Sequence, residues 1–173
     1  VYEPQRHIIV LRNGAIFAVD VVGEDGQALP FSTIQASLDG VMDATASLFN
    51  MRSDDSVSVL TSAKRADWAR ARKYMSELDP ENAASFALIE KSIFAIVLSQ
   101  ESPADHEEVA RHALLGDGRN KWYDKPFNLV VHENGRMGLN GEHAWADAMA
   151  IVNLFSFVLK YIDEQQPMRG PAA

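Results

Sequence analysis

Short apolar runs that meet at Asn-Gly dipeptides mark two predicted hairpins. The first covers residues 7–22, HIIVLRNGAIFAVDVV, and turns at Asn13-Gly14; the second is FNLVVHENGRMGLN, which turns at Asn134-Gly135. Asn and Gly adopt the positive backbone angles that a tight turn between strands needs. A third run, IFAIVLS at residues 93–99, is continuous and apolar, which is typical of a buried strand.

Helical spacing predicts a helix after the first hairpin, from apolar residues three or four positions apart: Phe31, Ile34, Leu38 and Val41 or Met42. Ser32 is the expected cap of this helix. The next segment is expected to pass through a short extended stretch, Val57–Leu60, into a second helix. Thr61 or Ser62 is placed to cap that helix, and Trp68 lies in its middle.

Three further helices are predicted, in DPENAASFALIEKS, from about Ala104 to Leu115, and in the long final segment AWADAMAIVNLFSFVLKYIDEQ. Strands and helices are therefore mixed, and one strand is reached through helices. This order predicts an α/β fold with a layered mixed sheet and flanking helices. Residues 1–166 are expected to form one unit, and residues 167–173 a loose tail.

Composition narrows the class of protein. The 173 residues are 47% apolar and 23% charged, as in a folded globular chain, and carry a formal net charge of −8. This charge argues against a nucleic-acid surface, which would need clustered Lys and Arg. The sequence has no cysteine, which excludes disulfides and a cysteine nucleophile within it. No run approaches the roughly 20 apolar residues of a transmembrane segment.

His143 is the first candidate for chemistry, because it stands where the second hairpin ends and the last helix begins. If that helix starts near Ala144, its positive dipole end favours a neutral imidazole, which is what a general base must be. Asp147, one turn further on, could fix the tautomer of the ring. The alternative is a structural histidine at a helix start. A metal site would need a third ligand, and His112 and His132 lack ligand spacing, so no metal is predicted.

A second cluster lies in LLGDGRNKWYDKPFNLVV, where Trp122, Tyr123, Asp124 and Lys125 fall in a short irregular stretch before a strand. It can be a surface loop whose aromatic residues pin it to the core. It also leads directly to the strand pair that delivers His143.

Together the two segments resemble the carnitine/choline acyltransferase family. That family carries G-D-G-x-N-R-W-[FY]-D-K and, about twenty residues on, G-x-N-x-E-H-[ST]-x-[AG]-[DE]. Here these stand as GDGRNKWYDKPFNLVV and GLNGEHAWADA, with Ala144 where Ser or Thr is usual. The upstream LTSAKRADWAR (60–70) and the opening hairpin are also similar to family elements, so the resemblance runs from about residue 6 to 161.

The resemblance implies an acyl transfer between acyl-CoA and the hydroxyl of carnitine or choline, with a CoA-dependent acyltransferase-like fold and no covalently bound cofactor. His143 would be the general base and Asp147 the residue that orients it. The expected supports of the active-site wall are Asn140, Glu142, Trp122, Tyr123, Asp124 and Lys125. The expected compartment is mitochondrial or peroxisomal.

Family members are longer and have two α/β halves that face each other across a tunnel. The chain is therefore interpreted as the His-bearing part of the N-terminal half, whose partner is the remainder of the same polypeptide. Alone, it is expected to be almost inactive and to self-associate through exposed apolar surface. Two alternatives remain open: a non-catalytic regulatory or structural domain that keeps the fold, and a small stand-alone CoA-dependent acyltransferase that works as an oligomer.

Overall fold

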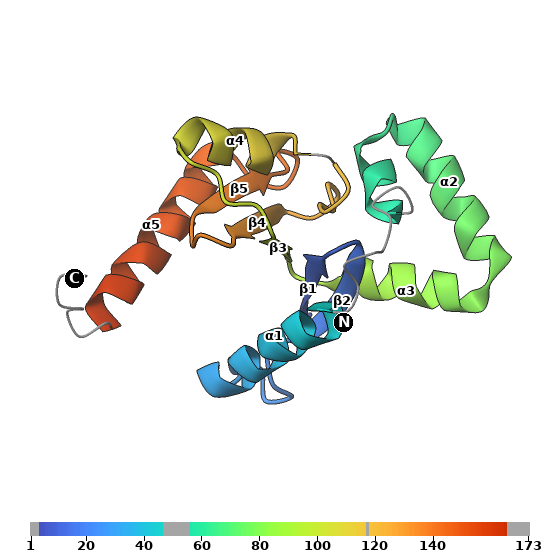
Figure 1. Cartoon of the computed structure of the whole chain (residues 1–173). Coiled ribbons are helices and arrows are strands. Elements are labelled where there is room, and N and C mark those ends of the chain that lie inside the picture. Colours follow the sequence, from blue (N-terminus) through green and yellow to red (C-terminus); the bar gives the residue numbers. More distant parts are fainter. Residues whose placement is uncertain (1–3, 47–55, 117, 166–173) are drawn as a thin grey trace.

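A five-stranded mixed sheet forms the centre of the computed structural model, which describes residues 4–46, 56–116 and 118–165 (Figure 1). The strand order is β2-β1-β3-β4-β5. The strands are β1 (His7–Arg12), β2 (Ala15–Asp20), β3 (Ala95–Ser99), β4 (Phe127–His132) and β5 (Met137–Gly141). The predicted α/β fold with a mixed sheet and flanking helices is therefore confirmed. The predicted tail at 167–173 lies outside the described residues.

Both Asn-Gly hairpins are confirmed, and they form the two edges of the sheet. β1 and β2 pair antiparallel, as do β4 and β5. Asn13 and Gly14 have φ of 51° and 79°, and Gly135 has φ of 79°, which are the positive angles that the dipeptide predicted. The central pairs, β1 with β3 and β3 with β4, are parallel. Parallel neighbours require crossover connections, and helices supply them.

The helices are α1 (Phe31–Ala46), α2 (Arg65–Leu78), α3 (Pro80–Lys91), α4 (His106–Leu114) and α5 (Ala148–Gln165), with a 3-10 helix, η2 (Val57–Ser62). Figure 1 shows α2 and α3 together at one end of the sheet, and α4 beside β4 and β5. The last helix, α5, projects away from the sheet at the other end. No helix among the described residues is long and apolar enough to cross a membrane.

Side chains that alternate along the strands supply two apolar clusters, one on each face of the sheet. On one face, Trp68, Phe86 and Trp122 pack together over Ile9, Leu11, Ala95, Val97 and Val130. On the other, Val41 of α1 packs over Ile8, Val10 and Val19. The first cluster is the larger, and it ties the loop before β4 to α2 and α3.

Several predicted boundaries are wrong for local reasons. Residues 57–62 form a 3-10 helix instead of an extended stretch, because Thr61 Oγ1 and Ser62 Oγ donate to the carbonyls of residues 58 and 59. Neither residue caps α2, which begins at Arg65 after Lys64, and Trp68 lies in its first turn. Ser32 lies within α1 instead of capping it.

Candidate active site

His143 lies in a turn between β5 and α5 that is fastened to one carbonyl group. The backbone N–H of Glu142 and the indole N–H of Trp145 both donate to the carbonyl oxygen of Pro126, at 2.9 and 2.6 Å. The carboxylate of Glu142 accepts the N–H of Ala144 at 2.8 Å and closes the turn. Pro126 immediately precedes β4, so the turn is fixed to the start of the strand that pairs with β5.

The structure brings His143 and Asp147 together, with 3.3 Å between His143 Nε2 and Asp147 Oδ1. The predicted helix start at Ala144 is wrong, because α5 begins at Ala148. A helix dipole acts within about the first turn, so the predicted position of His143 at the dipole end of the helix is wrong. The side chains of His143 and Asp147 are 78% and 84% exposed. The arrangement is an imidazole beside a carboxylate, open to solvent, which can accept a proton from a ligand that docks there.

The loop that carries Trp122 is anchored to the first apolar cluster and to β4. Trp122 is 2% exposed and meets Trp68 edge to face, with 5.9 Å between ring centroids. Its N–H donates to the side-chain oxygen of Asn128 at 2.9 Å, and its carbonyl accepts from the amide of Asn128 at 3.1 Å. Asn128 is fully buried, so this reciprocal pair fixes the loop on β4. The structure thus supports the interpretation of Trp122 as a pin to the core.

Asp124 and Tyr123 bind the loop to η2 and α2. Asp124 accepts the indole N–H of Trp68 at 2.6 Å and pairs with Arg65 at 2.8 Å. The N–H of Tyr123 donates to Thr61 Oγ1 at 3.0 Å. Three residues of the 60–70 segment therefore contact the 122–124 loop. The two sequence motifs, about sixty residues apart, form one hydrogen-bonded assembly.

Lys125 connects the same loop to the end of α3. Its ammonium donates to the carbonyls of Glu90 and Ser92, at 3.0 and 2.6 Å, and so holds the end of α3. Burial lowers the pKa of the Lys125 ammonium to about 8, although the nearby Glu90 carboxylate acts in the opposite direction. Asn140, on β5, makes a long contact of 3.5 Å to the carbonyl of Leu114. The contacts of the loop and of Asn140 are thus structural, and their place in an active-site wall stays a prediction.

Sequence reasoning missed the residue that joins the two groups of candidates, Pro126. Its carbonyl carries the turn, and it directly follows Lys125 at the end of the anchored loop. The missed signal was its position between the two motifs. Trp145 was also missed as an anchor. Its ring centroid lies 6.4 Å from that of Phe127. Among the described residues, no group of three His, Asp or Glu could hold a metal ion.

Comparison with known proteins places these observations in a family. The family model described as Choline/Carnitine o-acyltransferase matches residues 1–172. Mitochondrial carnitine O-palmitoyltransferase 2 of Bos taurus is 32% identical over 158 residues, covering 91% of this chain and 23% of that protein. Peroxisomal carnitine O-octanoyltransferase of Homo sapiens is 32% identical over 163 residues, covering 92% and 25%. Carnitine O-acetyltransferase of Homo sapiens is 31% identical over 179 residues, covering 98% and 28%. The chain spans about a quarter of the length of these relatives.

Proposed function

The chain belongs to the choline/carnitine O-acyltransferase family, and from this membership we propose that the polypeptide containing it transfers acyl groups between coenzyme A and the hydroxyl of carnitine or choline. The observation that carries the proposal is the contact of 3.3 Å between His143 and Asp147, in a turn held by the anchored 122–126 loop. An imidazole that is paired on one ring nitrogen has its other nitrogen available for a substrate proton.

In the proposed reaction His143 acts as a general base. It takes the proton of the acceptor hydroxyl while the oxygen attacks the thioester carbonyl of acyl-CoA. The tetrahedral intermediate collapses by breaking the C–S bond, and the imidazolium returns the proton to the departing thiolate. The products are the acyl ester and free CoA, and no acyl-enzyme forms. Asp147 holds the ring and favours the imidazolium that appears in between.

Carnitine is the preferred acceptor in this proposal, because the relatives described above are named for carnitine. Two of those names, a mitochondrial and a peroxisomal protein, support either compartment for this chain. We extend the proposal to the partner as well. The remainder of the polypeptide would cover the exposed site and supply the contacts to both substrates.

The exposure of the site leads us to propose that the isolated 173-residue chain is almost inactive. His143 and Asp147 are 78% and 84% exposed, so water has free access to both. Acyl transfer also needs preorganised donors at the developing oxyanion, each contributing roughly 3–4 kcal/mol. A base without such donors and without bound substrates gives little rate.

The test is release of CoA thiol from acetyl-CoA and palmitoyl-CoA, with carnitine and then choline as acceptor. It compares this chain with the full polypeptide that its gene encodes, each beside a His143→Ala variant. Release by the full polypeptide only, lost in the variant, is the expected result. Release by neither would refute the enzymatic proposal and favour a non-catalytic domain. Turnover by the isolated chain would refute its dependence on the remainder.

A further inference from the structure

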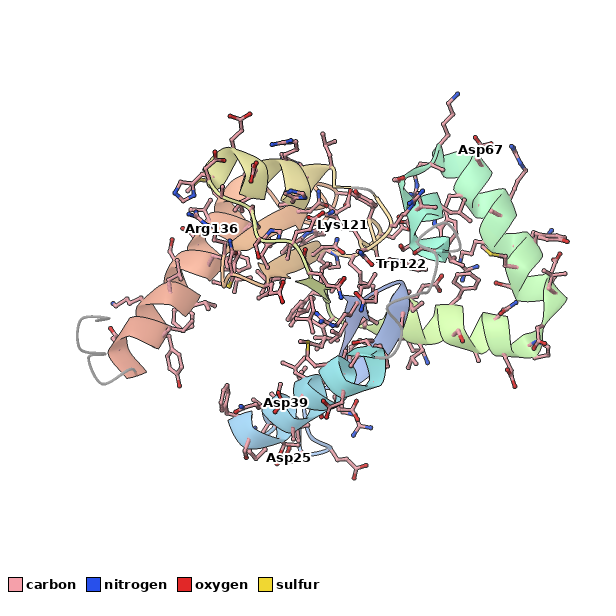
Figure 2. The ribbon with its side chains drawn as sticks, in the orientation of Figure 1. Asp25, Asp39, Asp67, Lys121, Trp122 and Arg136 are labelled. Atoms are coloured by element: carbon pink, nitrogen blue, oxygen red, sulfur yellow. The ribbon has the colours of Figure 1, made fainter. Side chains whose placement is uncertain are left out.

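A polar cavity of about 160 Å³ lies at the carboxyl ends of β3 and β4, two of the parallel strands. Its walls include Ser99 at the end of β3 and Glu101 just after it, His132 at the end of β4, His112 of α4, and Lys121 of the following loop. Figure 2 marks Lys121 on the loop that runs from α4 towards η2. Ligands of open α/β sheets characteristically bind at the carboxyl ends of strands. A cavity of this size suits a ligand smaller than the drug-sized molecules that fill pockets of roughly 300–1,000 Å³.

His132 is the unusual residue of this cavity. It is 3% exposed, and both ring nitrogens are buried without a hydrogen-bond partner among the described residues. Buried polar side-chain atoms nearly always have a partner, so an unpaired ring calls for an explanation. Burial lowers the pKa of His132, and the nearby His112 and Lys121 act in the same direction. The Glu101 carboxylate acts in the opposite direction. The ring is therefore neutral near pH 7 and presents one N–H donor to the cavity.

The charges around His132 favour an anion. Lys121 is 4% exposed, and its Nζ lies 2.5 Å from the place that a Cβ of Gly116 would take, so the ammonium packs closely against this glycine. Glu101 is the one carboxylate among the described residues that line the cavity, and its Oε2 lies 2.5 Å from His112 Nδ1. One oxygen of the Glu101 carboxylate is therefore already bonded within the wall. A buried ammonium and a buried N–H donor then face the same polar space.

We propose that this cavity binds a small oxyanion, a carboxylate or a phosphoryl group, with His132 as hydrogen-bond donor and Lys121 as the cationic group. The site is separate from His143. Phe127, at the start of β4, pairs with Gly141 beside the His143 turn, whereas His132 ends the strand. Five residue steps of about 3.3 Å put the two ends roughly 17 Å apart. The proposal therefore stands whether or not the acyl-transfer reaction is correct.

The experiment is isothermal titration of the full polypeptide that the gene encodes at pH 7.5, with inorganic phosphate and, separately, acetate. Chloride at matched ionic strength is the reference. Saturable binding above chloride is expected, and the anion that binds more tightly identifies the phosphoryl or the carboxylate class. His132→Leu should weaken that binding at least tenfold. The matched control, His106→Leu, removes an exposed histidine of α4 and should leave binding unchanged.

A second pair of variants keeps the test decisive if the buried substitution unfolds the protein. Gln100 lines the same cavity and is exposed, so its replacement does not disturb the core. Gln100→Glu should weaken anion binding several-fold, and Gln100→Lys should tighten it. Absence of saturable binding would mean that the cavity takes only water, and would overturn the proposal. Equal affinity in both Gln100 variants would overturn it too, because the anion would then bind elsewhere.

Discussion

At the scale of single residues, Asp147 contacts two neighbours with one oxygen. Its Oδ1 lies 3.3 Å from His143 Nε2 and accepts the N–H of Ala148, the first residue of α5, at 3.2 Å. Asp147→Asn separates these two contacts, because asparagine also serves well at a helix start but carries no charge. Stability should stay within about 0.5 kcal/mol of the parent protein. The kcat for acyl transfer by the full polypeptide should fall by about tenfold or more, since a neutral amide neither fixes the tautomer nor stabilises the imidazolium.

Glu164→Gln is the control for Asp147→Asn. It makes the same acid-to-amide change on α5, where Glu164 forms an exposed pair with Lys160. Its kcat should match that of the parent protein. Equal kcat values in Asp147→Asn and Glu164→Gln would show that Asp147 does not position His143.

Asp124 is the second residue for which a substitution is informative. Its carboxylate partners the indole N–H of Trp68, whose side chain is buried at 3% exposure. Asp124→Ala would leave this donor unpaired, at a cost of about 1–3 kcal/mol in the free energy of unfolding measured with urea. Asp39→Ala is the matched control, on α1 (Figure 2), and should cost nothing, because alanine is the better helix former at an exposed position. An equal change in both variants would contradict a structural role for Asp124.

At the scale of elements, the local signals in the sequence predict some features well and others poorly. Asn13-Gly14 fixes its hairpin because these two residues themselves supply the positive φ angles of the turn. The start of α5 depends instead on a distant partner, Pro126, as well as on the adjacent Asp147. Residues 144–147 could continue the helix, but Trp145 bonds to Pro126 and Asp147 accepts the first N–H of the helix, so the chain turns there first. The 3-10 helix at 57–62 has a local cause instead, since the hydroxyls of Thr61 and Ser62 bind carbonyls three residues back.

In the candidate site, too, some contacts follow from local sequence and others from residues far apart in the chain. The proximity of His143 and Asp147 could be predicted from their spacing, although the backbone between them is not helical. The contact between the 60–70 segment and the 122–124 loop could not, because it joins residues about sixty positions apart through Asp124. The sequence shows both segments as motifs, but their order along the chain does not predict that they are in contact.

The packing of α4 on β5 gives a prediction at this scale. A Cβ at Gly138 would lie 2.7 Å from Ala113 Cβ and 3.2 Å from Val109 Cγ1. Neither atom is the end of a flexible side chain, so Gly138→Ala must move the helix and should destabilise the fold by about 1–3 kcal/mol. Gly40→Ala, in α1, meets nothing within 4 Å and should stabilise by about 0.5–1 kcal/mol. Urea unfolding measures both, and a neutral Gly138→Ala would mean that α4 is not seated on β5.

At the scale of the whole molecule, α5 is a helix without a covering layer. Between residues 151 and 162 only Ile151 and Phe155 are half-buried, and Phe155 meets Phe127 of β4 with 5.9 Å between ring centroids. The rest of the helix projects from the sheet (Figure 1). Its exposed large apolar residues are Met149, Val152, Leu154, Phe157, Val158, Leu159, Tyr161 and Ile162. An apolar surface of this extent is typical of a protein interface.

Self-association of the isolated chain is the expected consequence. Sedimentation velocity over a series of concentrations should show a monomer that converts to larger species. Phe157→Glu places a charge in the exposed apolar surface of α5, where Phe157 is 69% exposed, and should weaken association by about tenfold or more. Phe31→Glu makes the same change at a residue that is 80% exposed on α1 and should have little effect. A chain that stays monomeric throughout, or a Phe31→Glu variant that dissociates equally, would mean that α5 is not the associating surface.

In the full polypeptide the same Phe157→Glu change should lower stability instead, because there the helix would be covered by the remainder of the chain.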